Sequence, residues 1–541
     1  MTEYLYRHIR RLSLWLVLLA VLQIGSATAQ STSDTPNFQS QIHALVQGNL
    51  QQRARVLDEL VAVDDQRLPA ILEALASGDL LADRSTPPQV AVRSQGILSD
   101  AFTGELIEQP SAELRRVPIN NSLRTRLRGL LAQLNLHHDS SQVRYEAVRR
   151  FIRDGVDQSS VALLEQRRQV EDSTLVLAAM DTAVALYQLQ GTDRQQQLTA
   201  IDTLSGSLEQ EARNALSRIA SQPNAAELSA AAQQALDSIQ HRLAFYRVVE
   251  NLFFGLSLGS VLLLAAIGLA ITFGVMGVIN MAHGELIMLG AYTTWGVQAL
   301  FPDLLEWSLL IAVPTAFLVT ALVGIAIERG VIRFLYGRPL ETLLATFGLS
   351  LVLQQAVRSL FGPLNRSVSS PEWISGTLTI NPALSITYTR LYILLFGLAV
   401  FFALMAVMKR TSLGLKVRAV SQNRAMARAL GVRSNWIDAL TFGLGSGIAG
   451  VAGVALSQLT NVGPNLGQAY IIDSFMVVVF GGVGNLWGTL VSAMSLGLIN
   501  NALEPWAGAM LAKILVLVML ILFIQKKPRG LFPQKGRAAA D

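Results

Sequence analysis

The amino-acid sequence predicts an all-α protein in which an exported helical domain precedes a polytopic helical membrane domain. Its 541 residues are 51% hydrophobic and only 15% charged, with a mean hydropathy of +0.40, whereas soluble domains carry about 25% charged residues. Residues 1–245 contain 23 Arg, no Lys and 27 Asp plus Glu, while residues 246–541 contain 20 basic and 11 acidic residues. The mild net charge of +5 therefore averages an acidic part of −4 and a basic part of +9.

Residues 1–29 have the pattern of a secretory signal peptide. Three arginines precede an apolar run, Leu12–Ile24, and a stretch rich in small residues, Gly25–Gln30, follows. This pattern predicts cleavage after Ala29. An uncleaved anchor is the alternative, although the apolar run is shorter than the roughly 20 residues that a spanning helix needs. Either way, the segment that follows is expected to be periplasmic.

Residues 30–245 are expected to form a periplasmic domain of short amphipathic helices. In Val143–Ile152, for example, apolar residues recur at helical spacing. Breaks that contain glycine, proline or aspartate separate the helices near Arg153–Asp157, Gly191–Asp193 and Ser221–Asn224. Such helices favour a HEAT-like solenoid, and an irregular bundle is the alternative because no strict period is present. An interaction or scaffolding role is expected for this domain.

The sequence excludes several kinds of chemistry. The absence of cysteine removes disulfides, thiolate metal sites and cysteine nucleophiles. No G-x-x-x-x-G-K-[ST] phosphate loop occurs, so a partner chain must bind ATP if ATP drives this protein. His137 and His138 are adjacent and do not share a helix face, and His283 is the only histidine after residue 245, so no metal site and no catalytic residue are predicted. Basic residues lie between apolar runs, which argues against nucleic-acid binding.

Residues 246–541 contain eight or nine apolar segments that could cross a membrane. They are 252–278, 285–301, 307–327, 342–361, 391–408, 436–459, 471–483, 486–503 and 509–525. Basic residues gather after the third and fifth segments and in the carboxyl-terminal tail, so these regions are predicted to be cytoplasmic. A periplasmic amino terminus then requires an odd number of crossings. Segment 471–483 is short, and a re-entrant half-helix is its alternative.

Two interruptions between apolar segments supply the candidates for a solute path. The candidates are Asn280, His283, Glu285, Asp473, Gly481, Gly482, Gly484 and Asn485. The first three form an abrupt polar cluster, for which a capped turn at the membrane surface is the alternative. The last four indicate unwound backbone, which membranes tolerate only where it is buried in protein or lines a polar cavity. Broken helices are where transporters commonly bind solutes.

Two further features of the membrane half lead to predictions, the acidic residue Asp473 and a set of regularly spaced glycines. Asp473 opens segment 471–483, where an acidic group is costly and a functional candidate, and an ordinary helix cap is its alternative. The glycines of Thr441–Ala455 recur at three- and four-residue spacing. In a membrane helix this spacing lets backbones approach closely, so it predicts a helix-packing face.

A loop predicted to be cytoplasmic contains a short amphipathic helix that could dock into a partner protein. Its residues are Asn423, Arg424, Ala425, Met426, Arg428, Ala429, Leu430 and Gly431. Asn423 is expected to cap the helix and Gly431 to end it, with the apolar residues on one side and the two arginines on another. Such a helix fits a groove on another protein, and contact with anionic membrane lipid is the alternative.

These features together resemble the membrane permeases of the branched-chain amino acid ABC transporter family. The stretches Ile271–Glu285 and Asp473–Thr489 are most similar to the urea permease subgroup of that family. The resemblance implies one permease subunit of a bacterial inner-membrane importer, with a second related permease, two cytoplasmic ATPases and a periplasmic solute-binding protein as partners. It implies no cofactor in this chain, because the ATPase subunits would bind the ATP, and it gives Asn423 to Val432 the ATPase-docking role.

Import of urea is therefore the expected function, and two alternatives remain. The first is import of branched-chain or other neutral amino acids by the same kind of permease. The second is a passive channel for small neutral solutes, in which the basic loop would only bind lipid.

Overall fold

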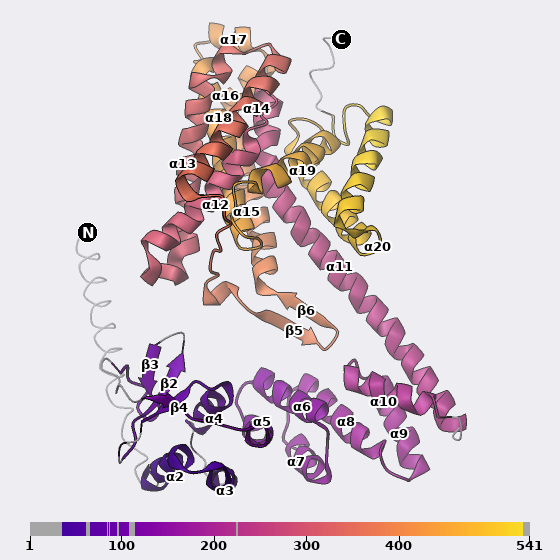
Figure 1. Cartoon of the computed structure of the whole chain (residues 1–541). Coiled ribbons are helices and arrows are strands. Elements are labelled where there is room, and N and C mark those ends of the chain that lie inside the picture. The colour runs from indigo at the N-terminus through magenta and orange to yellow at the C-terminus, as the bar shows by residue number, and fades with distance from the viewer. Residues whose placement is uncertain are drawn as a thin grey trace, which may run out of the picture. The chain divides into compact units, whose positions relative to one another are not determined.

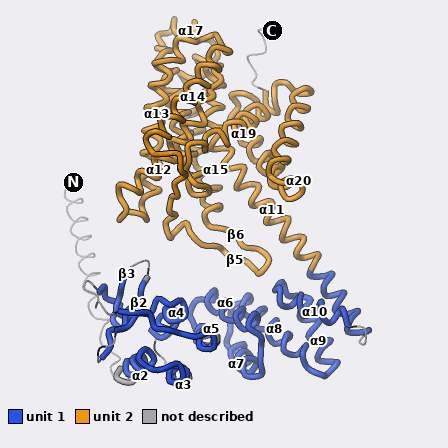
Figure 2. The backbone as a smooth tube through the Cα atoms, in the orientation of Figure 1, with its two compact units in different colours: residues 1–239 blue, residues 240–541 orange. Residues whose placement is uncertain are grey.

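The computed structural model describes residues 35–60, 65, 67–83, 85, 87–94, 97–107, 114–222 and 226–533. The predicted signal peptide, residues 1–29, lies outside these ranges. The chain divides into two compact units, residues 1–239 and 240–541, which Figure 2 draws in blue and orange. Helix α11 (Ala226–Met276) belongs to both, because its first residues lie in unit 1 and the rest in unit 2. The change in hydropathy near residue 245 therefore falls within one continuous helix.

Unit 1 consists mainly of short helices that follow one another along the chain (Figure 1). They are α2 (Thr35–Gln47), α3 (Leu50–Leu60), α4 (Leu68–Ser77), α5 (Asn121–Asn135), α6 (Ser141–Asp154), α7 (Gln158–Arg168), α8 (Thr174–Gln188), α9 (Arg194–Ser205) and α10 (Gln210–Ala220). From α5 onward each helix packs on neighbours close in sequence, such as α6 on α8 and α8 on α9. The three predicted breaks are confirmed, since α6, α8 and α10 each end at one of them.

The expectation of helices alone was wrong for residues 80–116. Here the chain forms an antiparallel sheet in the order β3-β2-β1-β4. Its strands are β1 (Leu80–Ala82), β2 (Val90–Ser94), β3 (Ile97–Asp100) and β4 (Arg115–Arg116). Leu80 pairs with Val92, and Leu80 and Val90 are buried in one core with α2 to α5. The apolar runs are only three to five residues long, and such short runs suit strands packed on helices better than helices.

A buried ion pair lies in the helical part of unit 1. Arg144 on α6 donates hydrogen bonds of 2.9 and 2.7 Å to the carboxylate of Glu171, whose side chain is fully buried. Burial alone would raise the pKa of Glu171, but Arg144 and the backbone N–H of Ser173 stabilise the charged form and lower the pKa to about 2. The Glu171 carboxylate therefore holds the turn that follows α7 against α6.

Unit 2 is built from long helices. After α11 they are α12 (His283–Leu300), α13 (Ser308–Gly330), α14 (Pro339–Phe361), α15 (Tyr388–Arg410), α16 (Ser412–Gln422), α17 (Arg424–Ala429), α18 (Ser434–Ser457), α19 (Leu466–Gly481) and α20 (Leu486–Lys526). Short 3₁₀ turns lie at η1 (Pro302–Trp307), η2 (Ile332–Phe334) and η3 (Glu372–Ile374), and β5 (Thr377–Asn381) pairs with β6 (Leu384–Thr387) as a hairpin.

The predicted apolar segments all fall largely within these helices. Among the described residues, six helices are long and apolar enough to cross a membrane. The shorter α12 and α19 account for segments 285–301 and 471–483, and α20 contains the last two segments. The backbone of α20 departs from helical geometry at Gly508, which separates those two. The fold is thus a mainly helical amino-terminal unit that is followed in the sequence by a polytopic helical membrane domain.

Helix α18 forms the centre of unit 2, and the predicted glycine packing face is confirmed there. Almost all of its side chains are buried, and it packs on both α12 and α13. An added Cβ at Gly450 would collide with Thr320 of α13, and one at Gly453 would collide with the backbone of α12 at Ile287. Glycine therefore allows α18 to lie directly against the backbones of its neighbours.

Candidate functional site

The first interruption of the membrane helices is the segment 277–282, called the first break below. Helix α11 ends at Met276 and α12 begins at His283. Gly277 has φ +68°, a left-handed conformation that residues with a side chain rarely adopt, so glycine ends α11 here. Asn280 accepts a hydrogen bond of 3.0 Å from the backbone N–H of Ala282. It therefore stabilises the turn before α12 rather than capping the helix itself.

The predicted polar cluster of the first break is buried in protein. Asn280, His283 and Glu285 are each at most 1% exposed, so a turn exposed at the membrane surface does not describe them. His283 Nε2 lies 2.8 Å from the carbonyl oxygen of Ala265 on α11, and Nε2 must carry the proton because a carbonyl only accepts. The Glu285 carboxylate accepts a hydrogen bond of 3.0 Å from the Ser350 hydroxyl on α14.

Three polar atoms of this cluster have no hydrogen-bond partner among the residues that the structure describes. They are Asn280 Nδ2, His283 Nδ1 and Glu285 Oε2. Buried polar atoms are nearly always paired, and each unpaired one costs about 1–3 kcal/mol. An amide donor, an imidazole acceptor and a carboxylate acceptor are thus available in the interior of unit 2.

A polar stripe on α14 faces the first break, and sequence reasoning did not identify it. The stripe consists of residues at every fourth position, Thr342, Thr346, Ser350, Gln354 and Arg358. Thr346 Oγ1 accepts a hydrogen bond of 3.1 Å from the N–H of Met281 and lies 3.3 Å from the carbonyl of Ile279, to which it can donate. The signal was present in the sequence, since residues four apart share a helix face.

The far end of the stripe reaches the start of α19. Gln354 and Arg358 donate to the side-chain oxygen of Asn465, at 3.3 and 2.6 Å. Gly284 of α12 lies against Gly467 of α19, where an added Cβ on either would collide with the other backbone. The first break, α14 and the start of α19 therefore form one continuous polar contact region.

The second interruption, residues 482–485, is called the second break. Its unwound backbone is confirmed for Gly482, Gly484 and Asn485, but Gly481 is the last residue of α19 and is therefore helical. Gly482 has φ +101°, between the end of α19 and the start of α20. Asn485 caps α20 by accepting a hydrogen bond of 3.2 Å from the N–H of Gly488, and its amide donates to the carbonyl of Phe532 at 3.2 Å. Gly484 touches Gly274 of α11 so closely that a Cβ on Gly274 would collide with it.

Asp473 does not join either break through a hydrogen bond or ion pair among the described residues. Because α19 begins at Leu466, Asp473 lies inside the helix, and the alternative that it caps the helix is wrong. Its carboxylate is largely buried and accepts a hydrogen bond of 3.2 Å from Lys513 Nζ on α20. Asp473 thus ties α19 to α20 rather than contributing to the polar cluster around Glu285.

A cavity of about 760 Å³ lies beside the second break. Its lining combines the end of α11 at Gly274, the end of α15 at Lys409, residues of α16 such as Arg418, and Asn485 with Trp487. Basic and amide side chains meet apolar ones at this cavity, which suits a water-accessible position near the end of the helices.

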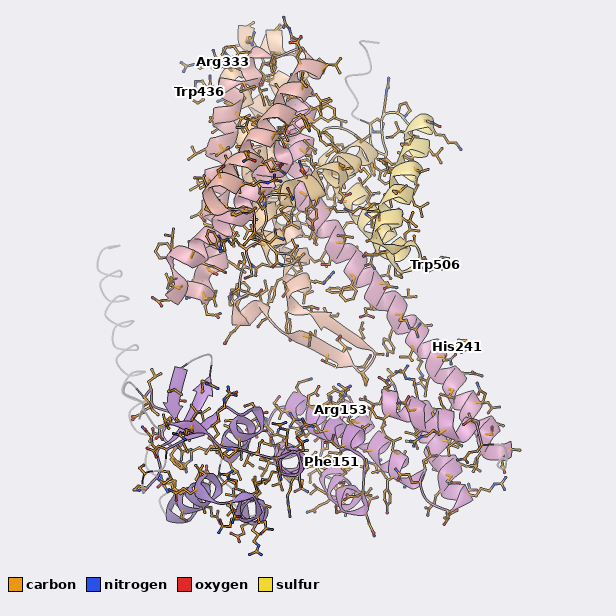
Figure 3. All side chains as sticks on the ribbon, viewed as in Figure 1. Phe151, Arg153, His241, Arg333, Trp436 and Trp506 are labelled. Atoms are coloured by element: carbon orange, nitrogen blue, oxygen red, sulfur yellow. The ribbon has the colours of Figure 1, made fainter. Side chains whose placement is uncertain are left out.

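The predicted docking helix forms as α17. Asn423 Oδ1 accepts a hydrogen bond of 2.9 Å from the N–H of Met426, and Gly431 follows the helix with φ +84°. Met426 is 58% exposed and Leu430 is 78% exposed, as expected for an apolar face that awaits a partner. Figure 3 shows Arg333 and Trp436 at the same end of unit 2 as α17.

The two arginines of α17 both contact α18, although Arg428 as a whole remains exposed. Arg424 forms a bidentate ion pair with Asp438, with N–O distances of 2.7 and 2.9 Å, and its guanidinium lies 4.6 Å from the centre of the Tyr336 ring. Burial raises the pKa of the Tyr336 hydroxyl above its usual range. Arg428 Nε donates to the Ser434 hydroxyl at 2.6 Å. The apolar and basic sides are thus separated as predicted.

Among the described residues, no group of three or more His, Asp or Glu side chains is placed to hold a metal ion. The interior polar groups are hydrogen-bonding amides, hydroxyls and single carboxylates. Groups of these kinds can form hydrogen bonds with a small polar molecule.

Comparison with known proteins identifies relatives of unit 2. The family described as "Branched-chain amino acid transport system / permease component" matches residues 251–524. The permease protein BraD of the Pseudomonas aeruginosa high-affinity branched-chain amino acid transport system is 30% identical over 296 residues, which cover 53% of this chain and 96% of BraD. The corresponding protein LivH of Escherichia coli K12 is 29% identical over 297 residues, again 53% of this chain and 96% of the relative.

A sugar permease is also similar. The ribose import permease protein RbsC of Escherichia coli K12 is 28% identical over 292 residues, which cover 52% of this chain and 87% of RbsC. No solved structure matches the chain. The family match begins at residue 251, so unit 1 lies outside it.

Proposed function

Because this chain belongs to the family of permease components of branched-chain amino acid transport systems, we propose that it is the membrane permease subunit of an ATP-driven importer of urea. The observation that carries this proposal is the buried first break, where a discontinuous membrane helix presents unpaired polar atoms beside the polar stripe of α14. Discontinuous helices with unpaired polar groups are the usual solute sites of transporters.

The proposed solute path passes the first break and the stripe. Asn280 has an amide donor and Glu285 a carboxylate oxygen without a partner among the described residues, so the region holds both kinds of hydrogen-bonding atom. A small neutral amide such as urea carries a carbonyl acceptor and N–H donors and matches this pair.

Import of branched-chain or other neutral amino acids is the second candidate. The names of BraD and LivH favour it, while RbsC is named for ribose, so relatives of similar identity carry chemically different solutes. The resemblance of Ile271–Glu285 and Asp473–Thr489 to urea permeases supports urea. Family membership therefore does not identify the solute, and an uptake assay in which urea and leucine compete is needed to distinguish the two candidates.

ATP is expected to act through partner chains that dock on α17. Its exposed apolar face, with Met426 and Leu430, fits a groove of an ATPase subunit. We place α17 and the carboxyl terminus in the cytoplasm and unit 1 in the periplasm, because basic residues gather in the loops and tail on the side of α17. A second permease, two ATPases and a periplasmic binding protein complete the proposed importer.

Uptake into proteoliposomes tests the proposal. Vesicles that contain this chain with its partners should accumulate labelled urea with ATP and not with a non-hydrolysable ATP analogue. Excess unlabelled urea should block this uptake and excess leucine should not; the reverse pattern would assign the chain to amino acids. Urea entry into vesicles that contain this chain alone, without ATP, would favour a passive channel and contradict the proposal.

A further inference from the structure

Helix α17 is too short to hold its own position. It has six residues, and isolated helices of fewer than about 12 residues are marginal in water. The described contacts that hold α17 lead to α18 and its surroundings: the ion pair of Arg424 with Asp438 and the hydrogen bond of Arg428 to Ser434. Ala427 packs in the same small core as Ile437 of α18.

Arg424 makes the stronger of the two polar contacts. Asp438 is fully buried, so its charge depends on the bidentate guanidinium for compensation. The Tyr336 ring also packs against the guanidinium, at 4.6 Å from the ring centre. The sequence placed Arg424 in the docking surface, but its side chain is used inside the protein.

The surroundings of Asp438 connect this pair to α13 as well. Glu328 on α13 is buried nearby, and its neighbour Arg329 lies 4.3 Å from the Trp436 ring. Both acidic groups thus sit within a cluster whose positive charges come from Arg424, Arg329 and Arg333. The first turn of α18 is held by charges from α13 and α17 together.

Helix α18 then contacts the solute region through backbone packing. Gly453 lies against Ile287 and Gly290 lies against Gly450, so α12 and α18 touch without intervening side chains. Gly445 touches Gly268 of α11 in the same way. Close-packed interfaces of this kind transmit a displacement from one helix to the next because they have low compressibility. Helix α12 carries His283 and Glu285 at its start.

We propose that Arg424 is the positioning residue that couples α17 to α18, so that movement of a docked ATPase reaches the helices around Glu285. The proposal rests on the proposed function, since it takes α17 as the ATPase-docking helix. It separates two roles within α17: Met426 and Leu430 contact the partner, and Arg424 passes the motion inward.

Solute-stimulated ATP hydrolysis by the reconstituted full complex tests this coupling. Arg424→Gln and Asp438→Asn should each lower stimulation by solute-loaded binding protein about tenfold, within the usual range of coupling between sites, while unstimulated hydrolysis and the amount of co-purified ATPase stay unchanged. The double variant should lose no more than either single variant, because both remove one interaction. Arg424→Lys keeps the positive charge but loses the bidentate geometry of the guanidinium. Its stimulation by solute-loaded binding protein should lie between that of the unaltered complex and that of Arg424→Gln.

Arg338→Gln is the matched control, because it breaks an exposed ion pair with Glu341, at 3.0 Å, only two residues from Tyr336. It should leave stimulation unchanged. Full stimulation in the Arg424 and Asp438 variants would overturn the proposal. So would loss of the ATPase or of the folded chain in step with the loss of stimulation, which would assign the pair to docking or stability alone. Failure of ATP-dependent uptake in the unaltered complex would instead overturn the proposed function.

Discussion

The two breaks in the membrane helices look alike in sequence and differ in what they leave unpaired. Each begins with a glycine of positive φ, Gly277 in the first and Gly482 in the second, and each contains an asparagine. In the second break Asn485 has partners for both its oxygen and its amide, Gly488 and Phe532. At the first break and the start of α12, unpaired atoms remain among the described residues on Asn280, His283 and Glu285.

This difference distinguishes a break that serves helix packing from a break that is proposed to contact the solute. The second break is a complete helix cap with glycines in backbone contact, so its residues are explained by packing. The first break has the same backbone device but keeps costly unpaired groups in a buried position. Such a cost is understandable where a solute supplies the missing hydrogen bonds. Polar content alone could not distinguish the two.

The largest effect is expected at Glu285. Glu285→Gln keeps the shape and the contact with Ser350 but removes the charge, and Glu285→Leu removes the acceptors as well. ATP-dependent uptake should fall roughly 100-fold for Glu285→Leu, which corresponds to the loss of a buried hydrogen-bonding group, and less for Glu285→Gln. Initial uptake rates per reconstituted complex provide the measurement. Unchanged uptake by Glu285→Leu would remove the first break from the solute path.

An intermediate effect, on folding rather than on transport, is expected at Gly484. Its φ of +79° disfavours any side chain, and its backbone touches Gly274. Gly484→Ala should destabilise the membrane domain by about 1–3 kcal/mol, seen as a lower midpoint of thermal unfolding in detergent. Gly296→Ala is the matched control, because an added Cβ there meets no neighbouring atom. Equal stability of both variants would contradict the packing role of the second break.

The smallest effect is expected at Asn485. Asn485→Ala removes the cap of α20 and should cost about 1 kcal/mol of stability, while Asn485→Asp retains the cap and should cost less. Uptake per folded complex should change little in either variant. A loss of uptake as large as that of Glu285→Leu, at normal stability, would mean that the second break also contacts the solute.

The sequence predicted those features whose signal is local. Long apolar segments, the glycine face of α18, and the cap at Asn423 all follow from residues within one turn or one span. Their physical cause, helix periodicity or a nearby N–H group, needs no distant partner. The membrane helices and both breaks are therefore predictable from the sequence.

Features that depend on distant partners were missed. The sequence allows a helix cap at Asp473, because its actual partner, Lys513, lies 40 residues away and gives no local signal. Arg424 was assigned to the docking surface because nothing local indicates Asp438 as its partner. The stripe on α14 had a period of four, but its meaning required knowing that Ser350 faces Glu285. The sheet of unit 1 was missed because three-residue strands such as Leu80–Ala82 leave almost no periodic signal.

Thiol labelling tests most directly whether the solute passes the first break. The chain has no cysteine, so Ser350→Cys introduces a single thiol beside Glu285, and Ser492→Cys, buried on α20 against the carbonyl of Val477, is the control. In the reconstituted importer, ATP should make the thiol at position 350 reactive toward a small water-soluble reagent, urea should slow that reaction, and position 492 should stay unlabelled. Labelling at position 350 that neither ATP nor urea changes would contradict the proposed path.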